Sequence, residues 1–333
     1  MRRRGFLPCL AGAAVAGCGR KGRQSHRLRV AFIPRFTLAP IYLAAELGSF
    51  RQAGLEVEFI HIHQSALMPT LLAGGQIQVA MSSPTPAFIN AVLKGARMRI
   101  VAARDTTTPG CANSGAIFGN RRAFPGGLRD LRALKGKRVA IHNQTGLVAF
   151  SLDQLLASAG MTRNDINPVI MGVAEATAAV AAGKLDAVAA AELDKNLDLV
   201  SAEIVRSITL EEVLPNHQYT FVIFGADLLE GNPEAGIGFL WAYLHGVREY
   251  RAGKTPRALE ELARAARHDL AAVRAACRES ISRDGRPDRA SIQRFVDWAA
   301  GKGYLLRTVN ASELIDTRFV EEANRRLEQH TVP

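Results

Sequence analysis

Residues 29–62 read RVAFIPRFTLAPIYLAAELGSFRQAGLEVEFIHI and contain a pattern that recurs along most of the chain. Apolar residues form a short run over 29–33, and over 40–47 they return at helical spacing. Two glycines then mark a turn before a second apolar run at 55–62. The stretch therefore predicts a strand, a helix and a second strand.

This alternation continues to residue 103 and restarts beyond a turn-rich stretch at 104–113. The first set adds expected helices at 65–73 and 84–94 and expected strands at 77–81 and 98–103. The second set predicts strands at 137–142, 169–171, 187–190, 204–207 and 219–224, with helices at 146–158 and 174–182. Such alternation is typical of parallel sheets with helices on both faces. Beyond residue 233 the sequence predicts helices alone, including 256–267, 269–282, 288–300 and 316–328.

Two complete sets of alternating elements predict an α/β protein with two lobes. Each lobe is expected to be a mostly parallel sheet flanked by helices, followed by a helical C-terminal region. The first lobe would comprise 28–104 and 225–333, the second 113–222, with a hinge near 104–113 and 219–226. The alternative is a single large flavodoxin-like domain with a helical extension.

The N-terminus has the features of an export signal. A basic start and a short apolar stretch over 1–17 precede Cys18, and VAGC at 15–18 resembles a bacterial lipobox. We expect removal of 1–17, lipidation of Cys18 and a polar tether over 18–27. RRGFL at 3–7 resembles the twin-arginine motif, with ordinary Sec export as the competing route and a buried N-terminal helix as the alternative structure.

Composition narrows the class of protein further. The 333 residues carry a net charge of +11, yet aromatics make up only 6% and the basic residues are scattered. Nucleic-acid binding usually shows a basic helix or stacking aromatics, so no nucleic-acid partner is expected. No apolar run reaches the roughly 18 residues of a membrane span, so attachment by lipid alone is expected. We further expect a monomer without a cofactor.

A family resemblance rests on several segments in a fixed order. TLAPIYLAAELGSFRQAGLEVE at 37–58 resembles the opening of ABC-transporter substrate-binding proteins of the sulfonate/nitrate/taurine and thiamine-precursor group. Further matching pieces lie at 71–79, 134–141, 181–188 and 232–234, so the resemblance covers about 28–325. It implies a type II periplasmic-binding-protein fold that closes on a small solute and delivers it to an ABC permease. The chain departs from the pattern at Gln78, where aspartate is usual, and at 191–193, which weakens any assignment of the ligand.

Ligands of open parallel sheets bind beyond the carboxyl ends of the strands, and this rule selects the candidate site. The candidate ligand-binding residues are Phe36, Thr37, Tyr42, His63, Gln64, Ser82, Ser83, Asn143, Gln144, Thr145, Gly146 and Glu192. Ser82, Ser83 and 143–145 open helices, whose free N–H groups bind carboxylate, sulfonate or phosphate. Simple N-capping is the alternative role for these polar residues.

The other candidates each have a structural alternative. Phe36 and Tyr42 are suited to stacking on a planar ligand or to core packing, and core packing is favoured for Tyr42. Glu192 is suited to pairing with a ligand amine, as the resemblance suggests, or to a solvated loop. His61 and His63 share one strand face but lack a third ligand, so no metal site is expected. Whether Cys111 and Cys277 form a disulfide is left open.

The resulting hypothesis is an exported lipoprotein that captures a small solute between two lobes for import. Helix N-termini rich in Ser, Thr and Asn favour a sulfonate, nitrate, taurine or another small oxyanion. An aminopyrimidine thiamine precursor is the alternative solute, and would need Glu192 and an aromatic sandwich. The alternative classes are a periplasmic enzyme and a sensor, although no GxSxG, Walker or HExxH motif is present.

Overall fold

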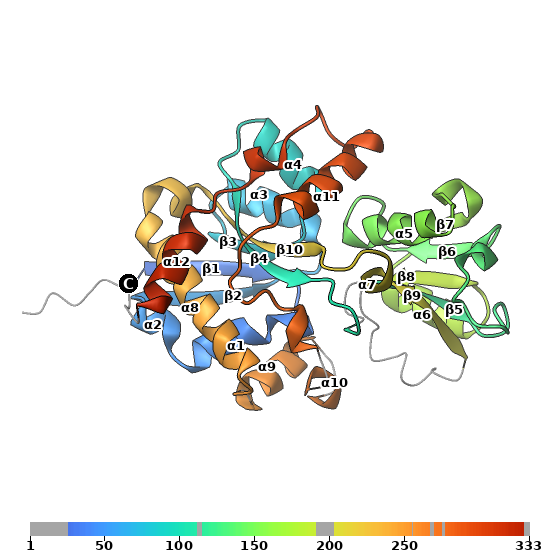
Figure 1. Cartoon of the computed structure of the whole chain (residues 1–333), viewed down its shortest axis with the longest axis horizontal. Coiled ribbons are helices and arrows are strands. Elements are labelled where there is room, and N and C mark those ends of the chain that lie inside the picture. Colours follow the sequence, from blue (N-terminus) through green and yellow to red (C-terminus); the bar gives the residue numbers. More distant parts are fainter. Residues whose placement is uncertain are drawn as a thin grey trace, which may run out of the picture.

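The computed structural model describes residues 26–111, 115–190, 203–254, 256–266, 270–274 and 277–329. It has two α/β lobes, each built on a five-stranded sheet (Figure 1). The larger lobe combines the N-terminal strands with the C-terminal helices, whereas the middle of the chain forms the smaller lobe. Cys18, the expected signal peptide and most of the expected tether lie outside the described residues.

The sheet of the larger lobe has the strand order β2-β1-β3-β10-β4. Its strands are β1 (His26–Phe32), β2 (Leu55–His61), β3 (Val79–Ser82), β4 (Arg99–Thr106) and β10 (Gln218–Phe224). β1 pairs in parallel with β2 and β3, and β10 runs antiparallel between β3 and β4. The expected mostly parallel sheet is confirmed, with one antiparallel strand inserted.

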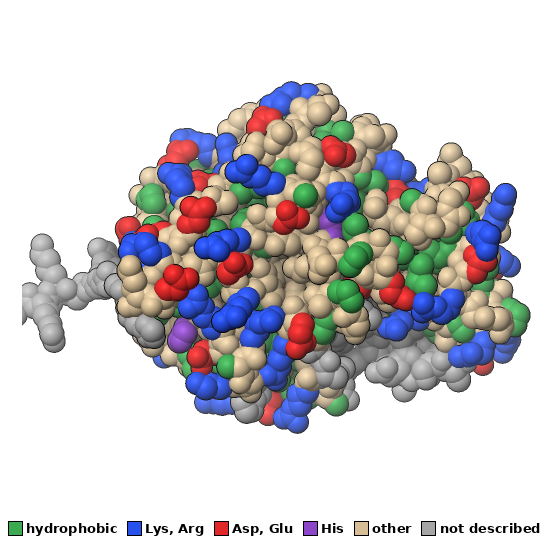
Figure 2. Space-filling view, in the orientation of Figure 1, with side chains coloured by type: hydrophobic (Ala, Val, Ile, Leu, Met, Phe, Trp, Pro, Cys, Tyr) green, Lys and Arg blue, Asp and Glu red, His purple; other side chains and the backbone are tan. Residues whose placement is uncertain are grey.

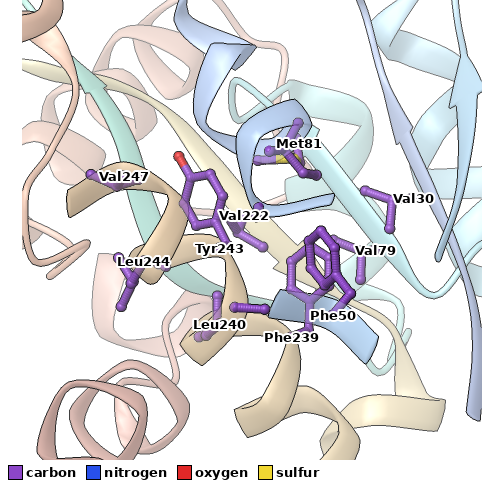
Figure 3. Packing of buried hydrophobic residues seen from close by; sticks show 14 of the residues in the cluster. Val30, Phe50, Val79, Met81, Val222, Phe239, Leu240, Tyr243, Leu244 and Val247 are labelled. Carbon is purple, nitrogen blue, oxygen red and sulfur yellow. The ribbon is translucent and has the colours of Figure 1, made fainter. Parts of the chain in front are cut away.

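Helices cover both faces of this sheet. One face carries α1 (Ala39–Glu46), α8 (Pro233–Arg251) and α12 (Arg318–Glu328), while α3 (Met68–Ala73), α4 (Pro86–Leu93) and α11 (Arg289–Gly301) cover the other. Successive residues of β10 point to opposite faces, so that Val222 packs toward α8 and Phe221 toward α11. On the α8 face, the rings of Phe50 and Phe239 stack 5.5 Å apart (Figure 3). Burial on both faces explains why the strands read as nearly continuous apolar runs.

The sheet of the smaller lobe has the order β7-β6-β8-β5-β9. It comprises β5 (Ala116–Asn120), β6 (Arg138–Ile141), β7 (Asn167–Ile170), β8 (Ala187–Ala190) and β9 (Ile204–Thr209). One face is covered by α5 (Leu147–Ser158) and the other by α6 (Val173–Ala181). β5 was not expected from the sequence, and it runs antiparallel between β8 and β9.

Two chain crossings connect the lobes, and their position corrects the predicted boundaries. The crossings lie between Thr106 and Ala116 and between Thr209 and Gln218, where the short helix α7 (Leu210–Val213) is located. The sequence predicts the β10 segment partly in the second lobe and partly in the hinge. In the structure it pairs with β3 and β4 in the first sheet. Its residues are apolar toward both faces, as a central strand requires.

The two crossings are hydrogen-bonded to each other. The backbone N–H of Thr107 donates to the carbonyl of His217 over 2.8 Å, and the N–H of His217 donates to the Thr107 hydroxyl over 2.8 Å. The lobes therefore meet at a short paired hinge rather than at two independent linkers.

A disulfide fastens this hinge to the larger lobe. Cys111, in the first crossing, is bonded to Cys277, with their Cα atoms 5.3 Å apart. The helix expected over 269–282 is shorter than predicted: α9 (Pro256–Ala266) is followed by α10 (Leu270–Arg274), and Ile281 then forms a bridge with Asp105 of β4. This return to the sheet brings Cys277 beside the crossing.

The surface agrees with the scattered charge of the sequence. On the face shown in Figure 2, Lys and Arg side chains are spread over both lobes and interspersed with acidic ones. Within the described ranges, none of the helices has the length and apolar character needed to cross a bilayer.

Candidate functional site

Two adjoining hollows lie between the lobes, at the carboxyl ends of the parallel strands. The inner hollow has a volume of about 60 Å³ and is lined by Ile33, Arg35, Ser65, Met68, Met81, Ser82, Ser83, Arg104, His142, Asn143, Leu147, Val148 and Thr220. The outer hollow has a volume of about 490 Å³ and is lined by Ile33, His63, Gln64, Ser65, Ala66, Thr85, Ala87, His142, Asn143, Thr145, Gly146, Gly172 and Val173. Both lobes contribute to each hollow, so a change in the angle between the lobes alters both.

The larger lobe presents two free hydroxyl groups to the inner hollow. Ser82 ends β3 and Ser83 directly follows it, and the two residues are only 8% and 9% exposed. The cap of α4 is instead Thr85, whose hydroxyl accepts a hydrogen bond from the N–H of Phe88 over 3.1 Å. Within the described residues, neither serine hydroxyl has a hydrogen-bond partner, so both remain available to a ligand.

The smaller lobe presents the N-terminus of α5 to the same space. This 12-residue helix begins after Gly146, which has no side chain to cap it. Asn143 stabilises the preceding turn, because its Oδ1 accepts from the Gly146 N–H over 2.9 Å. Leu147 and Val148 form the first turn and line the inner hollow. An uncapped first turn leaves N–H groups that favour an anion.

The charge around the hollows is positive. Arg35 and Arg104 line the inner hollow, and within the described residues neither hollow is lined by Asp or Glu. His142 lies between the two hollows. Desolvation lowers the pKa of His142, and the positive charge of Arg35 lowers it further. An anion bound here would offset that repulsion.

A buried polar cluster forms the floor of the inner hollow. Arg104 and Asp105, adjacent in β4, are 2% and 1% exposed, and Nη2 of Arg104 lies 2.9 Å from Oδ2 of Asp105. Two hydroxyl groups donate to the same oxygen, that of Thr37 over 2.9 Å and that of Thr220 over 2.5 Å. The cluster joins β4, β10 and the segment after β1 beneath the cleft.

Most of the residues predicted to bind ligand converge in this cleft. Those lining one or both hollows are His63, Gln64, Ser82, Ser83, Asn143, Thr145 and Gly146. They come from three separate segments and both lobes, as the strand-end rule requires.

The remaining predicted residues lie elsewhere. Thr37 faces Asp105 beneath the cleft, and Tyr42 packs in the core, where its hydroxyl lies 3.1 Å from Nε2 of His61. Gln144 is exposed, and its carbonyl accepts from Arg163 over 3.2 Å. Neither hollow includes these three among its lining residues. The side chain of Phe36 and the whole of Glu192 lie outside the described residues.

Sequence reasoning missed the cations and one hydroxyl of the inner hollow. Thr220 lies in the apolar run expected as a strand at 219–224. The sequence predicts Arg104 as the first residue of the turn-rich stretch at 104–113, whereas the structure places it inside β4. Arg35 directly follows Pro34, which ends the first apolar run, so it lies in the segment that the strand-end rule selects. The rule takes no account of its charge.

In the part of the chain that the structure describes, His61 and His63 gain no third metal ligand. The three candidate ligands that lie together there are Cys111, Cys277 and Glu279, and the two cysteines are joined by the disulfide.

Two α/β lobes, joined by paired crossings and enclosing a polar cleft, define a type II periplasmic-binding-protein fold. The chain belongs to the NMT1/THI5-like family, whose model matches residues 35–253.

Solved structures of the same fold support this assignment. The chain is similar to the periplasmic aliphatic sulphonate binding protein SsuA from Escherichia coli, with a TM-score of 0.67, 18% identity and coverage of 88% of this chain and 92% of that one. It is similar to the periplasmic nitrate-binding protein NrtA from Synechocystis PCC 6803, with a TM-score of 0.72, 16% identity and coverage of 93% and 91%. At these identities the likeness concerns the fold.

A curated relative has a closer sequence. The chain is 29% identical over 231 residues to the nitrate import ATP-binding protein NrtC of Synechococcus elongatus. The match covers 66% of this chain but only 35% of that protein, so the chain spans about a third of its length.

Proposed function

We propose that this protein is the solute-binding component of an ABC importer and captures a small organic or inorganic oxyanion between its lobes. The observation that carries the proposal is the cleft itself: free serine hydroxyls, an uncapped helix N-terminus and two arginines converge there, without a lining carboxylate among the described residues. The similarity to sulfonate- and nitrate-binding proteins supports the same class of solute.

Binding would couple to lobe closure. The larger lobe supplies Ser82, Ser83 and Arg104, whereas the smaller supplies Asn143 and the α5 N-terminus. A ligand that contacts both sets only when the lobes approach binds the closed state more tightly, and therefore shifts the open–closed equilibrium. The permease would then recognise the closed, ligand-bound conformation.

We also propose that the protein acts outside the cytoplasm, tethered through a lipid on Cys18. The lipobox-like VAGC and the export signal support this location. Mass spectrometry of the mature protein from its native membrane tests it. A diacylated Cys18 at the N-terminus is the expected result, and an intact N-terminal segment or a free Cys18 thiol would contradict it.

The competing hypotheses find less support in the cleft. An aminopyrimidine would be stacked between aromatic rings, yet within the described residues no Phe, Tyr or Trp side chain lines either hollow. A hydrolase would pair a nucleophile with a base, but neither Ser82 nor Ser83 has a histidine partner in the described chain.

A ligand panel read by thermal shift tests the function. Nitrate, ethanesulfonate, taurine, benzenesulfonate and an aminopyrimidine precursor are each titrated, and a ligand at a hundred times its Kd stabilises the fold by about 2.7 kcal/mol. An oxyanion should raise the Tm, and Ser83→Ala or Asn143→Ala should suppress the rise. Ser158→Ala and Asn164→Ala are matched controls away from the hollows, and should leave the shift unchanged.

Two outcomes would favour the alternatives. Stabilisation by the aminopyrimidine alone, lost in Glu192→Ala and retained in Ser83→Ala, would identify a precursor-binding protein. A change in the mass of a stabilising ligand after incubation would identify an enzyme.

A further inference from the structure

Arg104 is a cation buried at the floor of the inner hollow with its hydrogen-bonding capacity only partly used. Its Nη2 donates to Asp105 and, over 3.0 Å, to the Thr37 hydroxyl. Its Nε is buried without a partner. A guanidinium carries five N–H donors, so this side chain retains donors for a further acceptor.

The surroundings of Arg104 are poorly suited to a purely structural ion pair. Oδ1 of Asp105 is also buried without a partner, and the Tyr243 hydroxyl lies within reach of the Arg104 guanidinium. In Figure 3 the Tyr243 hydroxyl points away from the stacked Phe50 and Phe239 rings. A buried ion pair stabilises a fold only when its remaining polar atoms are satisfied. The cluster is therefore better explained by a role in binding than by a role in stability.

The pair is also fixed in position. Oδ2 of Asp105 accepts from Thr37, Arg104 and Thr220, which come from three different segments of the chain. Asp105 holds the Arg104 guanidinium from one side. Arg104 and Thr220 also line the inner hollow.

We propose that Arg104 is the anion anchor of the larger lobe and that Asp105, Thr37 and Thr220 are its positioning residues. The oxyanion group of the ligand would bind Arg104, Ser82 and Ser83 in the inner hollow, and an uncharged remainder would extend into the outer hollow. This inference rests on the proposed binding of an oxyanion. It adds that the larger lobe holds the charged group before the smaller lobe closes.

The test separates binding from folding by removing the two charges singly and together. Arg104→Gln leaves Asp105 as an unpaired buried carboxylate and should lower the Tm, whereas Arg104→Gln/Asp105→Asn replaces the ion pair by two neutral amides and should recover most of that loss. Titration calorimetry with ethanesulfonate and with nitrate then gives the Kd of each variant. Arg248→Gln, which removes a partly buried arginine of the same lobe that contacts Asn324, is the matched control.

The anchor predicts that affinity does not follow stability. The double variant should bind about 100-fold more weakly than the wild type despite its recovered Tm, because a charge-assisted hydrogen bond is lost. Asp105→Asn keeps the cation and should bind within about tenfold of the wild type, and Arg248→Gln should be unchanged.

The outcomes distinguish this inference from the proposed function. A wild-type protein that binds neither anion, nor any other oxyanion of the panel, overturns both. A wild-type protein that binds, together with a double variant whose Kd recovers with its Tm, overturns the anchor alone. Complete loss of binding in a folded Asp105→Asn variant would likewise contradict the assignment of the binding charge to Arg104.

Discussion

The indole Nε1 of Trp298, in the larger lobe, donates a hydrogen bond of 2.8 Å to Oδ2 of Asp153, in the smaller lobe. Lys302 of the larger lobe lies 3.0 Å from the same oxygen, and Arg163 of the smaller lobe lies 2.6 Å from Oδ1. Phe150, from the same helix as Asp153, packs on Trp298 with ring centroids 5.6 Å apart. The lobes are thus joined at a third place, between α5 and α11, besides the two crossings.

This contact should contribute to the stability of the whole chain. Asp153→Asn removes the carboxylate that Arg163 and Lys302 share, so we expect the free energy of unfolding to fall by about 1–3 kcal/mol in urea denaturation. Asp130→Asn, which breaks an exposed pair with Arg132, should change the free energy of unfolding far less. Equal effects would mean that the α5–α11 contact is incidental.

The same contact makes Trp298 a reporter of lobe movement. The chain has two tryptophans, so Trp241→Phe leaves Trp298 as the single one. If closure rotates the lobes about the α5–α11 contact, a stabilising oxyanion should shift the emission of Trp298 in this variant. Unchanged emission at saturating ligand would show that the contact moves as one rigid body.

Removal of the Cys111–Cys277 disulfide should destabilise the protein. The bond joins residues separated by 166 positions and ties the first crossing to the larger lobe. Cys111→Ser/Cys277→Ser should lower the free energy of unfolding by about 2–4 kcal/mol. Reductant should lower the free energy of unfolding of the wild type to a similar value and leave that of the variant unchanged. Equal stability of the two proteins without reductant would argue against the bond.

His217 should make stability depend on acid pH. Its ring is buried in the second crossing and stacks on Phe150 at 5.3 Å, and desolvation lowers its pKa to about 4. Since the unfolded chain binds this proton at pH below about 6.5, the native state loses stability as the pH falls from 6.5 to 4, by up to about 3 kcal/mol.

The pH dependence of the Tm in His217→Gln isolates this contribution. The variant should be less stable at pH 7 but should lose less stability on acidification than the wild type. Parallel wild-type and variant curves would rule out His217 as the group responsible.

Anion affinity should increase as the pH falls. The pKa of His142 is depressed in the free protein by desolvation and by Arg35, and a bound anion would raise it again. Binding therefore favours the protonated ring, and ethanesulfonate, which stays ionised, should bind several-fold more tightly at pH 5 than at pH 7.5. His142→Gln should abolish this dependence in calorimetry, and the same slope in both proteins would contradict the assignment.

The sequence predicted the parallel parts of both sheets because strand and helix periodicities are local. β5 and the sheet membership of β10 were not predicted. An antiparallel strand is inserted where a distant part of the chain returns to the sheet, and local periodicity does not report that position. The strand-end rule likewise placed Ser82, Ser83 and Asn143 at the cleft, because strand ends can be read from local periodicity. It missed Arg104 because the turn-forming residues of 104–113 predict a hinge there, whereas β4 continues to Thr106.

Thr37 and Tyr42 also lie in the segment after β1 that the strand-end rule selects. Tyr42 packs against Phe32 and Phe59, in agreement with the core packing that its apolar neighbours favoured. Thr37 hydrogen-bonds to Asp105 of β4, and no local pattern in the sequence reports such a distant partner.

Identification of the natural ligand tests the central claim most directly. Protein purified from its own cell envelope is analysed by native mass spectrometry, and the bound molecule is released and identified. A stoichiometric, chemically unaltered oxyanion, absent from Arg104→Gln/Asp105→Asn purified in the same way, is the predicted result. A cationic or uncharged molecule bound between the lobes, or an anion retained equally by that variant, would contradict the account.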